Sequence, residues 1–209
     1  MLFNSLQFLI FFPLVCIIYF ILKDNKSRIP FLLIASYYFY MNWNPAYAIL
    51  IFVSTLLTYL CGIFVEKHKE DNGKKKLFLT ISLIINFSIL FVFKYFNFIN
   101  ESVFVILEHL GIRWNVPNLD VLLPVGISFY TFQAVGYSID VYRGVVKAER
   151  NFIIYALFVS FFPQLVAGPI ERSQNLLPQF YEEHKFSYNN AIEGLKQMLW
   201  GFFMKICVA

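Results

Sequence analysis

The sequence predicts an all-α, polytopic transmembrane protein with a polar central helix and a kinked or re-entrant neighbour. The first observation is composition: of 209 residues, 59% are hydrophobic and 20% aromatic, whereas only 14% are charged. A soluble domain has about 25% charged residues, so the charged side chains here are too few to cover a water-facing surface. The second observation is a series of apolar runs of membrane-spanning length, and the third is the placement of Lys and Arg between them.

The apolar runs define seven predicted membrane segments. A helix needs about 20 residues to cross a bilayer, and six runs approach this length: residues 6–22, 47–65, 77–96, 122–139, 152–170 and 191–209. A shorter run covers residues 29–41. The first run follows no positive n-region and precedes no small-residue cleavage site, so we expect a membrane span instead of a signal peptide. Residues 103–110 are apolar but too short to span, and we expect an amphipathic helix on the outer surface.

The connections alternate in basic content. Three of them, residues 23–28, 67–76 and 143–150, hold three, five and three Lys or Arg, whereas 42–46, 97–121 and 171–190 hold none, one and two. The positive-inside rule places the first set in the cytoplasm, which leaves the N-terminus external. Because the net charge of +4 resides in these short connections, it does not indicate a nucleic-acid partner. The expected partner is the lipid bilayer.

Residues 123–144, LPVGISFYTFQAVGYSIDVYRG, are too polar for a helix that faces lipid. At 100° per residue two polar stripes form, Tyr130, Gln133, Tyr137 and Asp140 on one and Ser128, Thr131 and Ser138 on the other. Polar groups at membrane depth are costly unless they face protein or water. The helix is therefore predicted to be central, and it either lines a cavity or packs in a helix–helix seam. Asp140 and Arg143 are spaced for an i, i+3 ion pair.

Residues 160–172, SFFPQLVAGPIER, follow in the next membrane segment. Pro163 and Pro169 interrupt a regular helix, and broken backbone at membrane depth is tolerated only beside protein or a water-filled cavity. This predicts a kinked or re-entrant element, with Gln164 and Arg172 as further candidates for lining a passage. The alternative is a prolyl kink that only shapes packing.

The remaining reactive residue types predict no catalytic or metal site. His68, His109 and His184 fall in predicted loops, without the partners that a triad or a metal site needs. The three cysteines lie inside apolar runs and are predicted to be packing residues. We find no phosphate-binding loop, dinucleotide fingerprint or zinc motif, and expect no bound cofactor. These observations leave a transporter, a channel and an intramembrane enzyme open.

The polar helix and the broken segment resemble the membrane-bound O-acyltransferase family, and in particular its bacterial alginate O-acetyltransferase branch. The same resemblance extends to LLPQF, MLFNS, SYYFYMNWNPAY and FKYFNF. It implies transfer of an acyl group, acetyl in this branch, from a donor such as acetyl-CoA or an acyl carrier to hydroxyls of an extracellular polysaccharide such as alginate. It also implies a multi-pass protein of the bacterial inner membrane that works with other polysaccharide-modification proteins.

In this family an invariant histidine in a later membrane segment acts at the passage, where it can serve as a general base on the acceptor hydroxyl. No histidine here matches its context, so we expect it downstream of Ala209. Residues 1–209 are then the N-terminal part of a single transmembrane domain, truncated before the catalytic histidine and inactive alone. Two other functions remain open: a transporter or flippase for a lipid or glycan, with the polar helix as its path, and D-alanyl transfer to teichoic acid.

Overall fold

The computed structural model describes residues 1, 3–109, 116–118, 124, 126–165 and 168–208. All regular structure in this part of the chain is helical, which confirms the predicted all-α class. The helices are α1 (Leu6–Ile21), α2 (Asn25–Met41), α3 (Tyr47–Lys67), α4 (Asn72–Lys94), α5 (Phe96–His109), α6 (Ile127–Arg143), α7 (Phe152–Ser160), α8 (Phe162–Leu165), α9 (Ser173–Gln179) and α10 (Tyr188–Phe203), which continues as a π-helical turn, Met204–Val208.

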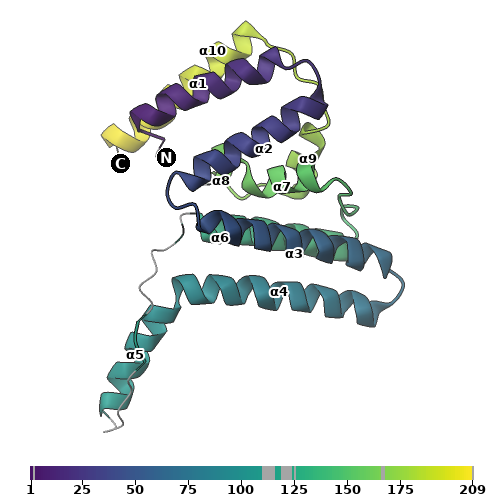
Figure 1. The fold of residues 1–209 in the computed structure, drawn as a ribbon, viewed down its shortest axis with the longest axis vertical. Coiled ribbons are helices and arrows are strands. Elements are labelled where there is room, and N and C mark those ends of the chain that lie inside the picture. The colour runs from purple at the N-terminus through teal and green to yellow at the C-terminus, as the bar shows by residue number, and fades with distance from the viewer. Residues whose placement is uncertain (2, 110–115, 119–123, 125, 166–167, 209) are drawn as a thin grey trace.

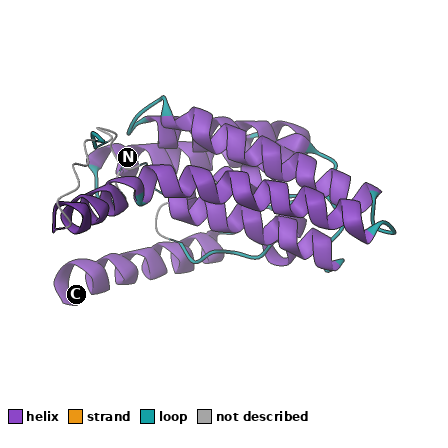
Figure 2. Cartoon of the chain, turned by 90° about the horizontal axis from the view of Figure 1, so that it is seen from below, coloured by secondary structure: helices purple, strands orange, loops and turns teal. Residues whose placement is uncertain are grey.

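The helices stack in layers (Figure 1). The best-packed layers are α2, α7, the pair α3 and α6, and α4, and the core lies where α3, α6 and α7 meet. Helix α5 leaves the stack at an angle beyond α4. Figure 2 shows α10, which carries the C-terminus, along the edge of the stack, and α10 has no buried residue.

The predicted spans differ in length. Only α3, with 21 residues, and α4, with 23, are long and apolar enough to cross a membrane by length and composition among the described helices. Helices α2 and α6 have 17 residues each and α1 has 16, which at 1.5 Å per residue gives about 25 Å. Residues 103–109 of the predicted amphipathic helix lie within α5, which begins earlier, at Phe96, and residue 110 is outside the described residues.

Two glycines with positive φ delimit α6. Gly126 (φ 78°) precedes the helix and Gly144 (φ 75°) follows it. A left-handed residue just after a helix is a common C-terminal cap and favours glycine. Gly126 has a second role, because a Cβ there would lie 2.7 Å from the carbonyl oxygen of Leu165. The absence of a side chain therefore lets the end of α8 pack on the beginning of α6.

The run predicted over residues 152–170 is not one span. Helix α7 ends at Ser160, and the four-residue α8 contains Pro163 in its first turn, where a missing N–H costs no helical hydrogen bond. The amide of Phe162 donates to the hydroxyl of Ser36 on α2, at 3.3 Å. Helix α9 then runs back beside α7 (Figure 1).

The segment after α9 returns to the end of the stack where α7 begins. Tyr181 donates to the Glu149 carboxylate at 2.7 Å, and the Asn25 amide donates to the carbonyl of Glu182 at 2.9 Å. Arg28 donates to the carbonyl of His184, also at 2.9 Å. These contacts place residues 181–184 at the same end of the helix stack as parts of the basic connections 23–28 and 143–150, whereas the sequence predicts residues 171–190 on the opposite side.

Candidate functional site

The polar face of α6 packs against protein. Tyr130, Thr131, Gln133 and Tyr137 are buried, with at most 5% of each residue exposed. The helix contacts α3 and α4 most extensively, and α7 and α9 as well. Phe129 and Phe132 on the opposite face are exposed. The predicted central position of this helix therefore matches its packing, and these four candidates lie in a helix–helix seam.

Gln133 completes the end of α7. Its side-chain amide donates to the carbonyl oxygen of Phe158 at 2.6 Å. The last four carbonyls of a helix have no partner within that helix, and Phe158 is two residues before the end of α7. A buried carbonyl left without a donor costs about 1–3 kcal/mol. Gln133, a predicted passage-lining residue, therefore provides the hydrogen-bond donor for a carbonyl at the end of α7.

Tyr137 joins α6 to the connection that follows it. Its hydroxyl oxygen accepts a hydrogen bond from the backbone N–H of Glu149 at 2.8 Å. Its ring lies 4.5 Å, centroid to centroid, from the ring of Tyr155, whose hydroxyl donates to Thr58 at 2.7 Å. A Cβ at Gly62 would lie 2.9 Å from two atoms of the Tyr137 side chain. The glycine in α3 thus leaves the room that this tyrosine occupies.

Asp140 and Ser173 connect α6 to α9. The Ser173 hydroxyl donates to the Asp140 carboxylate at 3.0 Å, while Arg143 and Arg172 are exposed. Among the described residues the ion pairs are Lys74–Asp71, Arg150–Glu66 and Lys196–Glu193. The Asp140–Arg143 pair suggested by their spacing is not among these, and Asp140 accepts a hydrogen bond from Ser173.

A set of hydrogen bonds at this same end, which we call the Glu149 latch, holds residues 149–151 against helices α3 and α6 and against Tyr181. The Glu149 carboxylate accepts from the Tyr181 hydroxyl and from the N–H of Asn151. Tyr59 donates to the carbonyl of Arg150 at 2.6 Å, and the Arg150 guanidinium pairs with Glu66. Burial, followed by the bond to Glu149, raises the pKa of Tyr181 to about 12.

The other three predicted site residues, Ser128, Gln164 and Arg172, lie apart from this seam. At the opposite end of α6, Lys94 donates to the Ser128 hydroxyl at 3.2 Å, which ties Ser128 to α4. Gln164 on α8 donates to the carbonyl of Pro169 at 2.9 Å. It lines a cavity of about 470 Å³ between α8 and α9. Gln164 is therefore placed at a hollow, whereas Arg172 precedes α9 at the surface.

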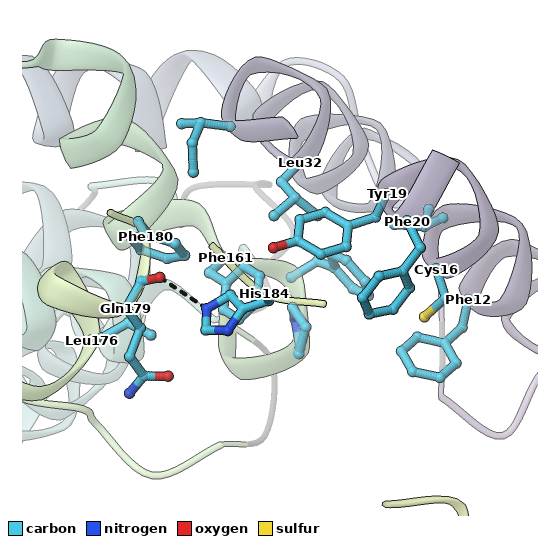
Figure 3. A pocket seen from close by; sticks show the side chains of 14 residues that line it. Phe12, Cys16, Tyr19, Phe20, Leu32, Phe161, Leu176, Gln179, Phe180 and His184 are labelled. Atoms are coloured by element: carbon cyan, nitrogen blue, oxygen red, sulfur yellow. Dashed lines mark hydrogen bonds between the residues drawn. The ribbon is translucent and has the colours of Figure 1, made fainter. Parts of the chain in front are cut away.

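Patterns in the sequence did not reveal the apolar hollows beside α1. One of about 230 Å³ lies between α1, α2, α8 and α9 (Figure 3), with Phe12, Cys16, Phe20 and His184 among its walls. These four residues also line a groove of about 900 Å³ between α1 and α10. In the sequence, α1 is apolar on all sides. In the structure, Leu6, Leu9, Ile10, Leu14 and Ile17 of this helix are exposed.

The three histidines are each engaged with nearby backbone. A ring nitrogen lies 2.9–3.0 Å from the carbonyl of Phe64 for His68, of Val105 for His109 and of Gln179 for His184. Within the described part of the chain, no group of three or more His, Cys, Asp or Glu could hold a metal ion. The arrangement is that of a scaffold with a polar seam.

Comparison with known proteins gives relatives along the entire chain. The probable alginate O-acetylase AlgI of Azotobacter vinelandii is 35% identical over 210 residues, covering 100% of this chain and 42% of that protein. The protein of the same name from Pseudomonas aeruginosa is 34% identical over 209 residues, covering 100% and 40%. A peptidoglycan O-acetyltransferase of Helicobacter pylori is 32% identical over 242 residues, covering 100% and 44%.

The chain spans about two fifths of the length of these curated relatives. No family model and no solved structure matches it. The relatives agree on O-acetyl transfer, and their names differ in the polymer that receives the acetyl group. The resemblance carried by the sequence motifs is confirmed, because this chain is homologous along its whole length to alginate O-acetylases and to a peptidoglycan O-acetyltransferase. This homology is consistent with an alginate O-acetyltransferase-like member of the membrane-bound O-acyltransferase family.

Proposed function

We propose that the protein containing this chain is a membrane-bound O-acetyltransferase that esterifies hydroxyls of an extracellular polysaccharide. The observation that carries this proposal is the match of the whole chain to proteins named for O-acetyl transfer to two different glycans. Both names specify O-acetyl transfer, but they specify different acceptor polymers. The proposed reaction class therefore has more support than the identity of the acceptor polymer. Alginate and peptidoglycan are the two acceptors to test first.

Residues 1–209 contribute the scaffold in this proposal. The buried polar seam of α6, with Gln133 bonded to the end of α7, holds the broken segment α7–α9 in place. The donor, acetyl-CoA or an acyl carrier, is a substrate that arrives from the cytoplasm. The general base is a histidine downstream of Ala209, so these residues alone transfer no acetyl group. Other polysaccharide-modification proteins act with the enzyme.

We further propose a multi-pass arrangement in the bacterial inner membrane with an external N-terminus. Helices α1–α4, α6 and α10 cross, whereas α7–α9 enter and leave at the cytoplasmic face. Support comes from the hydrogen bonds that join residues 181–184 to Asn25, Arg28 and Glu149, which belong to the basic connections. The 25 Å length of α2 and α6 is shorter than the roughly 30 Å hydrocarbon core, and local thinning accommodates such a mismatch. A thin centre shortens the distance between donor and acceptor.

Single cysteines in a cysteine-free full-length protein test this topology. An impermeant thiol reagent applied to intact cells should label Asn4→Cys, and it should reach Gly73→Cys and Glu183→Cys only after permeabilisation. All three positions lie outside the long helices or at their ends. Labelling of Glu183→Cys in intact cells would contradict the return of α7–α9 to the cytoplasmic face. Labelling of Gly73→Cys in intact cells would invert the whole orientation.

Deletion of the gene tests the function. Cell-envelope polymers from the deletion strain should lose alkali-labile acetate from one polysaccharide, and the full-length gene should restore it. A full-length gene with the downstream histidine changed to alanine should fail to do so at an equal protein level. Loss of D-alanine in place of acetate would assign the protein to teichoic acid modification. Unchanged esters in every polymer would overturn the proposal.

A further inference from the structure

A long apolar groove lies between α1 and α10, two helices that the proposed arrangement places across the membrane. It has a volume of about 900 Å³, and Figure 1 shows both helices at the same end of the stack. On the side of α1 its lining runs from Phe12 to Ile21, which is roughly 14 Å at 1.5 Å per residue. We call this hollow the α1–α10 groove. Because its lining follows both helices, it is elongated and suits a narrow, chain-like occupant.

The wall that α10 supplies is a single helix face. Ala191, Gly194, Leu195 and Met198 line the groove, at the i, i+3, i+4 and i+7 spacing that places side chains on one face. Because Ala191 and Gly194 are small, this face leaves room for an alkyl chain next to α1. The bulky residues at the end of α10 are exposed outside the lining: Leu199, Trp200 and Phe203.

One end of the groove is polar and positively charged. His184, Lys185 and Asn190 line it there, where the chain enters α10. Lys185 is the one charged residue in the described lining. The acidic residues at this end of the stack line neither the groove nor the smaller hollow beside it: Asp24, Glu182 and Glu183. An anionic group at the end of the occupant would therefore meet a cation.

A second cation lies behind this polar end. Arg28 is only 7% exposed, and its guanidinium donates to the carbonyl of His184 at 2.9 Å and to that of Leu22 at 2.7 Å. It also lies over the ring of Tyr19, 4.9 Å from the centroid, and both Tyr19 and His184 line the smaller hollow. The ion pairs of the described residues do not include Arg28. Its positive charge therefore adds to that of Lys185 at the same end of the groove.

We infer that the α1–α10 groove binds an anionic phospholipid from the leaflet that adjoins its polar end. One acyl chain lies along Phe12, Ile17 and Leu195, and the phosphate lies beside Lys185. Burial of the chain against apolar walls supplies most of the affinity, and basic residues at the membrane surface attract anionic headgroups. The inference rests on the proposed membrane arrangement and does not depend on acetyl transfer.

The test uses the full-length protein, purified in a mild detergent and incubated with phosphatidylglycerol and phosphatidylethanolamine that carry the same acyl chains. The first lipid is anionic and the second is zwitterionic, so the ratio of the two on the protein reports the contribution of the headgroup. Native mass spectrometry counts the lipids that remain bound. The wild type should retain phospholipid and should prefer phosphatidylglycerol.

A matched pair of glycine substitutions tests the position of the acyl chain. Gly194→Trp places an indole ring in the groove, at a residue where a Cβ would meet nothing within 4 Å. Gly201→Trp is the control, because Gly201 is equally free of neighbours but lies outside the lining. Gly194→Trp should lower the binding of both lipids about tenfold, since exclusion of two methylene groups is enough for such a loss. Gly201→Trp should leave binding unchanged.

A matched pair of lysine substitutions tests the headgroup. Lys185→Gln, at an exposed position that should not affect folding, should lower the preference for phosphatidylglycerol over phosphatidylethanolamine about fivefold. Lys196→Gln removes an exposed lysine that pairs with Glu193 outside the groove, and it should preserve the preference.

Three results would overturn the inference. A wild-type protein without bound phospholipid would show that another part of the full-length protein fills the groove. Equal binding of the two lipids by the wild type, or equal effects of Lys185→Gln and Lys196→Gln, would exclude recognition of an anionic headgroup. Equal losses in Gly194→Trp and Gly201→Trp would exclude the groove as the site. The proposed function fails separately, because lipid binding is measured without acetyl transfer and the topology is measured by cysteine labelling.

Discussion

Replacing Gly62 by alanine should destabilise the contact between α3 and α6. The new methyl group would lie 2.9 Å from Cε1 and from the hydroxyl oxygen of Tyr137 and 3.2 Å from its Cζ. The ring cannot move freely, because its hydroxyl is bonded to the Glu149 amide and its face lies against Tyr155. Overpacking of a core typically costs about 1–3 kcal/mol, and a displaced hydroxyl loses about 1 kcal/mol more.

The gain in helix propensity from glycine to alanine offsets about 1 kcal/mol, so we expect a net loss of about 2 kcal/mol. The matched control is Gly136→Ala in α6, where a Cβ would meet nothing within 4 Å and the propensity gain should remain as a small stabilisation. Both variants are compared with the wild type by thermal and denaturant unfolding of the full-length protein in nanodiscs. Equal effects of the two substitutions, or a more stable Gly62→Ala protein, would refute this account of the α3–α6 contact.

Three further predictions concern the broken segment and the Glu149 latch. Gln133→Leu should lower stability by about 1–3 kcal/mol, because the Phe158 carbonyl loses its donor, and proteolysis within α7–α9 should accelerate; an unaltered digestion pattern would count against this role. Gly126→Ala should cost more than about 1 kcal/mol, since both the positive φ and the contact with Leu165 forbid a side chain, and full stability in a denaturant titration would disprove that contact. The pKa of Tyr181 is raised to about 12, so its contribution to stability is fully present below its unfolded-state pKa of about 10 and is lost as pH rises through 12. Tyr181→Phe should therefore flatten the dependence of Tm on pH between about 10 and 12 relative to the wild type. Identical pH dependences of Tm in the two proteins would contradict the raised pKa of Tyr181.

The sequence was informative where a local pattern has one physical meaning. Polar residues at helical spacing within an apolar run must face protein or water, and this predicted the burial of Gln133 and Tyr137 on one face of α6. The all-α class followed from the apolar runs for the same reason. The pattern did not distinguish a cavity from a seam, because that depends on the shapes of the neighbouring helices.

The return of the chain after α9 was not predictable in this way. The hydrogen bond between Asn25 and Glu182 joins residues that are 157 positions apart in the sequence. No local sequence pattern predicts such a contact. The basic residues of the 171–190 segment were too few to decide its side. Pro163 announced a break, but the direction of the chain beyond it depends on the contact of Phe162 with Ser36 and on the meeting of Ser173 with Asp140.

The most direct test of the central claim is acetyl transfer by the full-length protein in sealed inner-membrane vesicles of known orientation. Acetyl-CoA labelled in the acetyl group is supplied on the cytoplasmic side, and the polysaccharide identified by gene deletion is enclosed on the other. The account predicts an alkali-labile labelled ester on the polysaccharide, which disappears when the downstream histidine is replaced by alanine. Movement of a lipid or glycan across the vesicle membrane without any labelled ester, unaffected by that replacement, would contradict it.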